Sequence, residues 1–169
     1  MIEIIPIDQV DPAWIEELLD QAFGGDRKGR TAYRVREGME ALEALSFAAV
    51  DGEGWLVGSI QCWPVMLTGD DGTIAPMIMV GPVAVSPAHQ EQGIGRALVR
   101  AVLGGIGENE TMPLMLIGDL DYYGRHFGFS AARTAGWRLP GPYEQDRLLA
   151  IVRDDVALPE KGMIGPYTG

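Results

Sequence analysis

The pattern of apolar and polar positions predicts a short strand and two helical stretches in the N-terminal part of the chain. Residues 2–6 read as a strand. From position 12 apolar side chains recur at helical spacing, and Asp11-Pro12 supplies an N-cap followed by a first helical residue. Gly24-Gly25 ends this helix. A second helical stretch is expected over residues 31–43, interrupted near Gly38.

Strand patterns dominate the middle of the chain. Residues 45–50 and 55–65 predict two strands around the turn 51–54, and a long apolar strand follows over residues 74–85. Gly81-Pro82 interrupts that strand, and because proline cannot donate to a strand ladder, the pair predicts a bulge or a splay. Residues 93–103 then predict an amphipathic helix.

The C-terminal part predicts alternating elements. We expect a buried strand over 113–118, a short helix over 121–126, and strands near 134–139 and 146–152. The tail, residues 156–169, is rich in Pro and Gly and is expected to lie across the surface. This order of elements indicates a mixed α/β sheet.

Composition narrows the class of protein. The 169 residues fit a single domain, 1–169, and the formal charge of −11 argues against nucleic-acid or anionic-membrane partners. The single cysteine, Cys62, excludes an intramolecular disulfide, and the two separated histidines make a metal site improbable. The N-terminus has no signal-peptide pattern and no apolar run is long enough to span a membrane, so we expect a cytoplasmic protein.

The most informative segment joins the long apolar strand to the amphipathic helix through Gln90-x-x-Gly93-x-Gly95. The first turn of a helix presents unpaired N–H groups and the positive end of the helix dipole, and glycines allow close approach to them. The segment therefore predicts a pyrophosphate site, to which Arg96 could add a charge. The alternative is that the two glycines merely turn the chain. A dinucleotide-binding fingerprint would need glycine where Leu98 stands, and no Gly-Lys-Ser/Thr of a Walker loop occurs.

Gln90, Gly93 and Gly95 resemble motif A of the GNAT superfamily of N-acetyltransferases, and residues 81–85 resemble the strand that precedes that motif. The segment 116–129, which contains Gly-Asp-x-x-Tyr-Tyr and ends in Gly-Phe, resembles a later strand and helix of bacterial members. The likeness covers residues 45–152. Family members usually have one residue fewer between the tyrosine pair and Gly-Phe.

The resemblance implies a single-domain GNAT-like acyl-CoA N-acyltransferase fold, with a central, mostly antiparallel sheet splayed at strands 4 and 5. Acetyl-CoA would be the cosubstrate, and no metal is implied. Val83, Ala84 and Val85 would lie along its pantetheine arm, which would pair with the backbone of Val83 and Val85 like an added strand. The pyrophosphate would be held by the loop and the first turn of the helix, at Gln90, Glu91, Gln92, Gly93, Ile94, Gly95 and Arg96.

Tyr123 is the candidate acid that would protonate the departing CoA thiolate, with Tyr122 as the alternative. A packed aromatic without a catalytic role is the competing interpretation of Tyr123. Asp119 or Asp121 could act as a base, but Asp119 fits better as a helix cap. His89 and His126 are expected to be structural.

The dense basic run between Arg27 and Arg36 is most simply a solvated face, although in this superfamily the segment borders the acceptor pocket. The leading hypothesis is direct acetyl transfer from acetyl-CoA to a primary amine of a small molecule, by an acyltransferase that transfers groups other than aminoacyl groups. A noncatalytic acyl-CoA-binding module and a peptide or protein N-acetyltransferase stay open, as does a homodimer.

Overall fold

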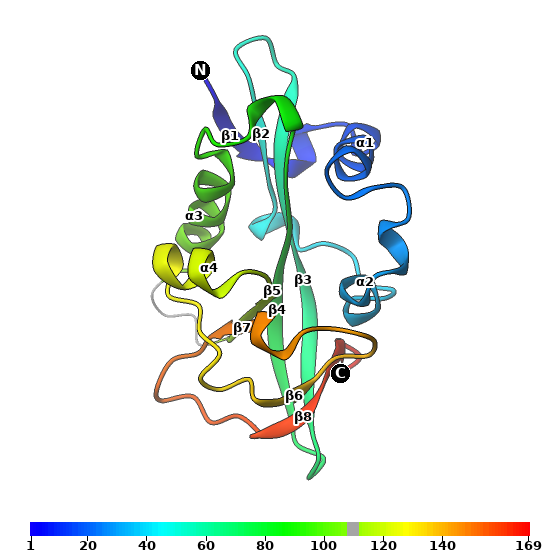
Figure 1. Ribbon diagram of the computed structural model, residues 1–169, viewed down its shortest axis with the longest axis vertical. Coiled ribbons are helices and arrows are strands. Elements are labelled where there is room, and N and C mark those ends of the chain that lie inside the picture. The colour runs from blue at the N-terminus through cyan, green and yellow to red at the C-terminus, as the bar shows by residue number, and fades with distance from the viewer. Residues whose placement is uncertain (108–111) are drawn as a thin grey trace. The chain divides into compact units, whose positions relative to one another are not determined.

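A computed structural model describes residues 1–107 and 112–169 (Figure 1). The fold is a mixed α/β sheet, mostly antiparallel, with the hydrogen-bonded strand order β1-β2-β3-β4-β5-β7. β8 pairs with β3 and with β6. The chain forms two compact units: Met1–Lys28, Ala41–Cys62 and Gly81–Asn109 in the first, and Gly29–Glu40, Trp63–Val80 and Glu110–Gly169 in the second.

The first unit contains β1 (Glu3–Pro6), α1 (Pro12–Phe23), β2 (Phe47–Val50), the first half of β3 (Leu56–Gly69), the end of β4 (Ile74–Val85) and α3 (Ile94–Ile106). The sequence signals for α1 are confirmed, because the Asp11 side chain accepts a hydrogen bond from Ala13 N at 2.9 Å and the helix ends at Gly24. The predicted helix after Gln90 is also confirmed and continues to Ile106.

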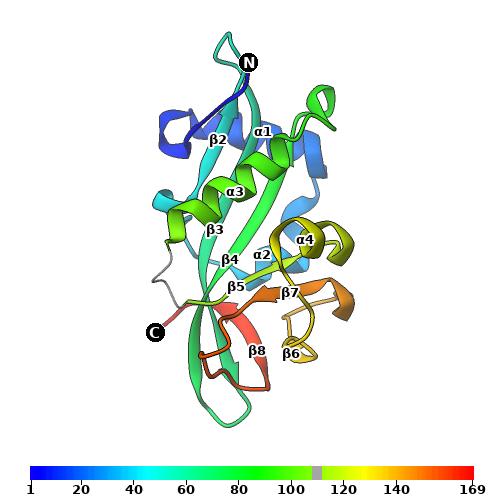
Figure 2. The same ribbon diagram turned by 90° about the vertical axis from the view of Figure 1, so that its left-hand side faces the viewer.

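α1 and α3 cover opposite faces of the strands in this unit (Figures 1 and 2). The buried face of α1, with Ile15, Leu18 and Leu19, packs in a cluster that includes Ala48 and Ala84. On the other face, a β-carbon at Gly58 would lie 2.9 Å from Ile94 Cγ2 and 3.2 Å from Leu98 Cδ1. Gly58 therefore lets α3 approach β3 more closely than any side chain would allow.

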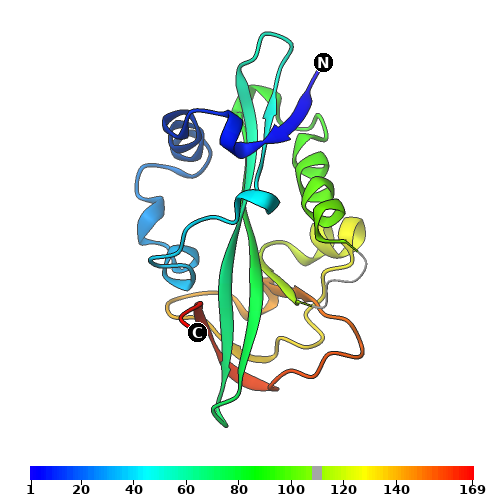
Figure 3. The same ribbon diagram turned by 180° about the vertical axis from the view of Figure 1, so that it is seen from behind.

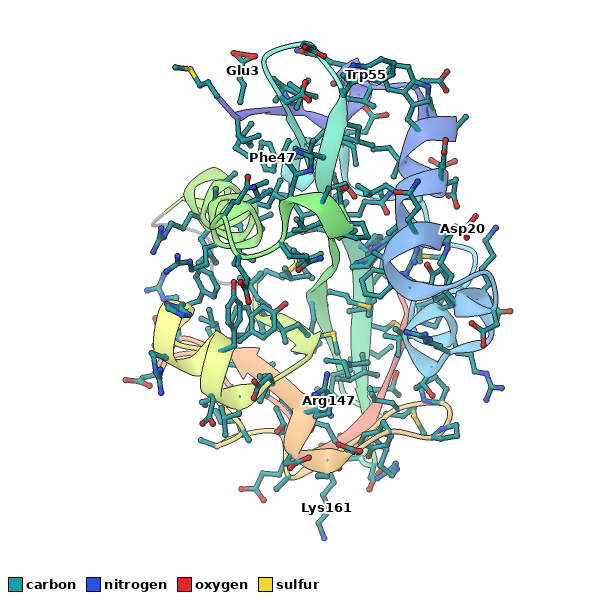
Figure 4. All side chains as sticks on the ribbon, turned by 45° about the horizontal axis from the view of Figure 1, so that its top comes forward. Glu3, Asp20, Phe47, Trp55, Arg147 and Lys161 are labelled. Carbon is teal, nitrogen blue, oxygen red and sulfur yellow. The ribbon has the colours of Figure 1, made fainter. Side chains whose placement is uncertain are left out.

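The opposite end of α3 has a second close contact with β2 and the turn before it. A β-carbon at Gly105 would lie 3.3 Å from Leu45 Cδ2 and 3.9 Å from Phe47 Cζ. Phe47, labelled in Figure 4, begins β2. The helix is thus held along its length, and its first turn is fixed relative to the end of β4 by packing at both ends.

The second unit contains α2 (Thr31–Val35), the second half of β3, the first half of β4, β5 (Leu114–Ile117), α4 (Leu120–Phe127), β6 (Gly136–Arg138), β7 (Leu148–Ile151) and β8 (Lys161–Pro166). β5 pairs antiparallel with β7 over its whole length. Gly118, just after β5, donates its N–H to Arg147 O at 2.9 Å, and Ser130, just after α4, bridges to Ala150. Both ends of the segment that carries α4 are therefore tied to β7 and the residue before it.

Three expectations from sequence were wrong. The tail does not simply lie across the surface, because Lys161–Pro166 forms β8, which pairs with Val65–Gly69 of β3 and runs parallel to β6 (Figure 3). That pairing also extends β3 beyond the predicted end at position 65. The helix expected over 31–43 is confined to Thr31–Val35 and a short turn of 3-10 helix at Glu43–Leu45.

β4 and β5 pair in parallel only at Ile78↔Leu114 and Met79↔Met115 within the described residues. β5 continues to Ile117 and β4 to Val85, and Gly81, with a φ of +122°, stands two residues beyond the last paired position of β4. The parallel pairing thus ends before Gly81-Pro82, the pair at which the sequence predicted a bulge or a splay, while β4 itself continues through it.

The close contact at Gly58 gives a test of the first unit. Gly58→Val should lower the free energy of unfolding by about 1–3 kcal/mol, because the new methyl groups would overlap Ile94 and Leu98. Gly52→Val is the matched control, since a β-carbon at Gly52 meets nothing within 4 Å, and it should change stability by less than about 0.5 kcal/mol. Denaturant unfolding of both variants measures the difference, and equal midpoints would contradict the packing.

Candidate active site

The end of β4 presents the backbone of Val83 and Val85 away from β3. Ser86 N donates to Val57 O of β3 at 2.8 Å. Because successive residues of a strand direct their hydrogen-bonding groups to opposite edges, Ala84 also faces β3, whereas Val83 and Val85 face the other edge. The Ala84 side chain is buried in the α1 cluster. Of the three strand residues assigned to the cofactor, Val83 and Val85 thus share the outward edge.

Gln90 ties the loop after β4 back to this outward edge. Its side-chain Nε2 donates to Val85 O at 2.9 Å. The carboxamide therefore holds the Val85 carbonyl and fixes the distance between the strand end and the loop. The sequence assigned Gln90 to the loop but contained no signal for this bond, since the bond depends on how the chain folds back over residues 85–90.

The loop turns into α3 through two residues with left-handed backbone. Glu91 has a φ of +66° and Gly93 a φ of +77°. α3 then begins at Ile94, and the first helical bond runs from Ala97 N to Gly93 O at 3.0 Å. Gly93 has no side chain to cap the helix, so the N–H groups of the first turn point out of the helix end without an intrahelical acceptor.

The helix start and Arg96 contribute positive charge here, and the carboxylate of Glu91 on the preceding loop contributes negative charge. The partial charge of the helix N-terminus is reinforced by Arg96, whose Nη2 lies 3.5 Å from the place that a β-carbon of Gly93 would take. Glu91 and Gln92 are exposed on the same loop. Outward N–H groups, left-handed turns and a guanidinium group together form an arrangement that suits an anion such as a phosphate.

In the second unit, α4 starts at a side-chain cap. Asp119 Oδ1 accepts from Asp121 N at 3.1 Å, which confirms Asp119 as the N-cap. The Tyr123 N–H continues the helix by donating to Asp119 O at 2.9 Å. Tyr123 is therefore held one turn from a fixed helix start.

The helix ends in a turn that is wider than usual. Gly128 has a φ of +83°, and Phe129 N donates to Tyr123 O at 3.3 Å, six residues back, whereas the common Schellman closure spans five. Tyr123 therefore anchors the helix end through its carbonyl as well as the helix start through its N–H.

Aromatic rings surround the Tyr123 side chain. Its ring centroid lies 5.0 Å from that of Tyr122 and 6.1 Å from that of the buried Phe129, in edge-to-face geometry in both cases. Burial raises the pKa of the Tyr123 hydroxyl to about 12, the neighbouring Tyr122 adds to the rise, and the positive charge of Arg147 (labelled in Figure 4) opposes it. A phenol with this pKa is a proton donor at neutral pH.

Tyr122 shares one aromatic neighbour with Tyr123, whose ring centroid also lies 6.2 Å from that of Phe127, and it packs on His126 as well. Its ring lies 5.0 Å from His126 and 6.2 Å from Phe127 by centroids. His126, whose ring also lies 6.0 Å from that of Phe127, is thus part of an aromatic cluster, as expected. Among the described residues, no three His, Cys, Asp or Glu side chains gather in a way that could hold a metal ion.

The basic run is not a uniformly solvated face. Arg27 is buried and pairs with Glu16 and Asp20 of α1, the second of which is labelled in Figure 4. Arg36 is also buried, with its guanidinium carbon 4.1 Å from the ring centroid of Tyr33 and 3.7 Å from that of Trp63. For these two residues the expectation of a solvated face was wrong, because acidic and aromatic groups elsewhere in each unit hold them.

The thiol of Cys62 is poorly suited to act as a nucleophile. The side chain is fully buried, and desolvation raises the pKa of its thiol to about 12, so the thiol stays protonated at neutral pH. Its N–H is held by the hydroxyl of Ser46 at 3.1 Å. A buried, protonated thiol is a poor nucleophile, so the structure gives no support to an acyl-cysteine intermediate at this position.

None of the helices in the described part of the chain combines the length and the apolar character needed to cross a membrane.

The structure offers two candidate functional regions, the loop Gln90–Arg96 in the first unit and Tyr123 on α4 in the second.

Comparison with known proteins finds similarity to acetyltransferases in both sequence and structure. Residues 4–132 match the family described as an acetyltransferase (GNAT) domain. The chain is 29% identical over 123 residues to the N-acetyltransferase YhbS of Escherichia coli, covering 73% of this chain and 70% of YhbS. The crystal structure of E. coli YhbS in complex with CoA superimposes with a TM-score of 0.71 at 26% identity, covering 99% of this chain and 89% of that one.

A second solved structure shows the same fold. A GNAT family acetyltransferase from Brucella melitensis, crystallised with acetyl-CoA, superimposes with a TM-score of 0.65 at 24% identity, covering 99% of this chain and 97% of that one. With a family match across most of its length, this chain belongs to the GNAT family of N-acetyltransferases.

Proposed function

We propose that the protein transfers an acetyl group from acetyl-CoA directly to a primary amine of a small molecule. The observation that carries the proposal is the start of α3, where outward N–H groups and Arg96 form a positive site at the end of β4. Its relative YhbS is known in complex with CoA, which supports the same cosubstrate for this chain.

The cofactor would bind in two ways. The pyrophosphate would accept hydrogen bonds from the first-turn N–H groups of α3 and from the loop over Glu91–Gly93, with Arg96 neutralising its charge. The pantetheine arm would pair with the outward edge of Val83 and Val85. Gln90 already occupies the Val85 carbonyl, so the amides of pantetheine would use the Val83 backbone and the Val85 N–H.

The chemical step needs few protein groups. The neutral amine attacks the thioester carbonyl carbon, a C–N bond forms, the C–S bond breaks, and sulfur leaves with the bonding electron pair. Tyr123 would give its hydroxyl proton to that thiolate, and the amine would lose its proton to water, from which Tyr123 is reprotonated. Asp119 is engaged as a helix cap, and proximity alone accelerates an amine that arrives neutral.

The charge of the protein favours a particular acceptor class. At −11 the chain attracts cations, so protonated amines would be concentrated around it, and the choice of a small molecule over a peptide N-terminus rests on the assay that follows. A panel of small primary amines and of peptides with free N-termini, assayed by CoA release, tests this choice. Turnover of peptides but not of small amines would contradict it, and the absence of turnover on both would favour a noncatalytic acyl-CoA-binding module.

CoA binding at the helix start is tested by Gly95→Asp. Gly95 lies in the first turn of α3, so the new carboxylate would stand where the pyrophosphate must bind, and we expect affinity for CoA to fall by on the order of 100-fold. Gly104→Asp is the matched control, because Gly104 is an exposed glycine near the other end of the same helix whose β-carbon would meet nothing within 4 Å. Calorimetric titration with CoA measures both, and equal affinities would refute the site.

Proton donation by Tyr123 is tested by Tyr123→Phe. The variant should lose about 10²–10⁴-fold in kcat, because a positioned acid is removed, while its affinity for acetyl-CoA stays nearly unchanged. Tyr122→Phe is the control on the same helix and should lose at most a few-fold. Steady-state kinetics with a confirmed amine decides between them, and a larger loss in Tyr122→Phe would move the acid to that residue.

The raised pKa of Tyr123 sets the shape of the pH profile. With a pKa of about 12 the hydroxyl stays protonated from neutral to moderately alkaline pH, so kcat/KM should rise as the amine loses its proton and then level off. No descending limb from this group is expected up to about pH 10. A descending limb below that pH that disappears in Tyr123→Phe would show that the pKa of Tyr123 is not raised.

A further inference from the structure

Gly118 lies directly against the ring of Tyr123. A β-carbon at position 118 would stand 2.6 Å from Cε2 and 2.9 Å from Cδ2 of that ring, and 3.0 Å from Leu116 Cδ1. Carbon atoms in contact lie roughly 3.5 Å apart or more. The ring therefore occupies space that only a glycine leaves open.

The backbone at position 118 does not itself require glycine. Its φ lies outside the left-handed range, and its N–H continues the β5–β7 ladder by donating to Arg147 O at 2.9 Å. The left-handed backbone that favours glycine is therefore not the reason for a glycine here. The demand for glycine thus comes from the tyrosine ring and the neighbouring leucine.

The ring cannot easily move elsewhere to relieve such an overlap. Phe129 packs edge-to-face against it, Tyr122 packs on it at 5.0 Å, and its backbone is held at N–H and C=O by Asp119 and Phe129. A β-carbon at position 118 would displace the ring by about 1 Å and move the hydroxyl with it. Displacements of this size are large enough to reduce catalysis.

We propose that Gly118 is a positioning residue, whose missing side chain sets the place of the Tyr123 ring and hence of its hydroxyl. The inference rests on the proposed function of Tyr123 as the proton donor. It also gives a physical reason for a glycine two residues before the start of α4 in the Gly-Asp-x-x-Tyr-Tyr segment.

The kinetic test compares Gly118→Ala, Tyr123→Phe and the double variant. Gly118→Ala should lower kcat by about 10–100-fold and change the KM for acetyl-CoA by less than about threefold. In the Tyr123→Phe background the same substitution should cost at most about twofold, because the group it misplaces is already absent. Equal losses in both backgrounds, or no loss in either, would overturn the proposal.

A second measurement is independent of turnover. The aromatic carbon–proton NMR signals of Tyr123, assigned by their absence in Tyr123→Phe, should shift in Gly118→Ala because the ring moves relative to Phe129 and Tyr122. Gly165→Ala is the control, since Gly165 is a strand glycine of the same unit whose β-carbon would meet nothing within 4 Å. Unshifted Tyr123 signals in Gly118→Ala would refute the packing even if the protein has no activity.

The two assignments can fail separately. If Tyr123→Phe keeps full kcat, the proton-donor role is wrong, and the NMR comparison still decides whether Gly118 sets the ring position. If Gly118→Ala does not fold, Tyr123→Ala should restore folding by making room for the new methyl group. Failure to fold in both backgrounds would show that position 118 acts through something other than Tyr123 and would overturn the proposal.

Discussion

The close approach of α3 to β3 is the contact on which the candidate cofactor site depends. At Gly58 the helix residues Ile94 and Leu98 take the space of a side chain, and at Gly105 the far end of the helix rests near Phe47. With both ends fixed, the first turn of α3 cannot slide along the strand. Its outward N–H groups therefore stand at a constant distance from the outward edge of Val83 and Val85. A cofactor that binds both the helix start and this strand edge would need that constant distance.

The second unit uses the same device for a different purpose. The ring of Tyr123 occupies the space that a side chain at position 118 would take. Hydrogen bonds with Asp119 and Phe129 fix the backbone that carries this ring. In both units a glycine in or beside a strand leaves room for a larger side chain from a helix, which then packs in one defined position. Neither glycine needs its freedom of backbone conformation at these positions, so both are defined by what packs on them.

Local signals were sufficient for the elements that begin and end with their own caps. Asp11 and Gly24 bound α1, and the glycines of the loop predicted the start of α3. The sequence could not predict β8, because its partner strand β3 lies far away in the chain and its own composition resembles a loop. The buried states of Arg27 and Arg36 were missed for another reason, since the carboxylates of Glu16 and Asp20 and the ring of Trp63 lie outside the basic run that was interpreted. The bond from Gln90 to Val85 depends on a three-dimensional fold-back that no spacing rule predicts.

The late position of β8 in the chain has a consequence for synthesis. The Val65–Gly69 half of β3 is made long before Lys161–Pro166, with which it pairs. Until residues 161–166 have been synthesised and have folded onto β3, the Val65–Gly69 stretch lacks its partner on that edge and exposes a row of backbone donors and acceptors. Such a row is a template for pairing with another copy, so slow docking of β8 would favour aggregation through this edge of β3.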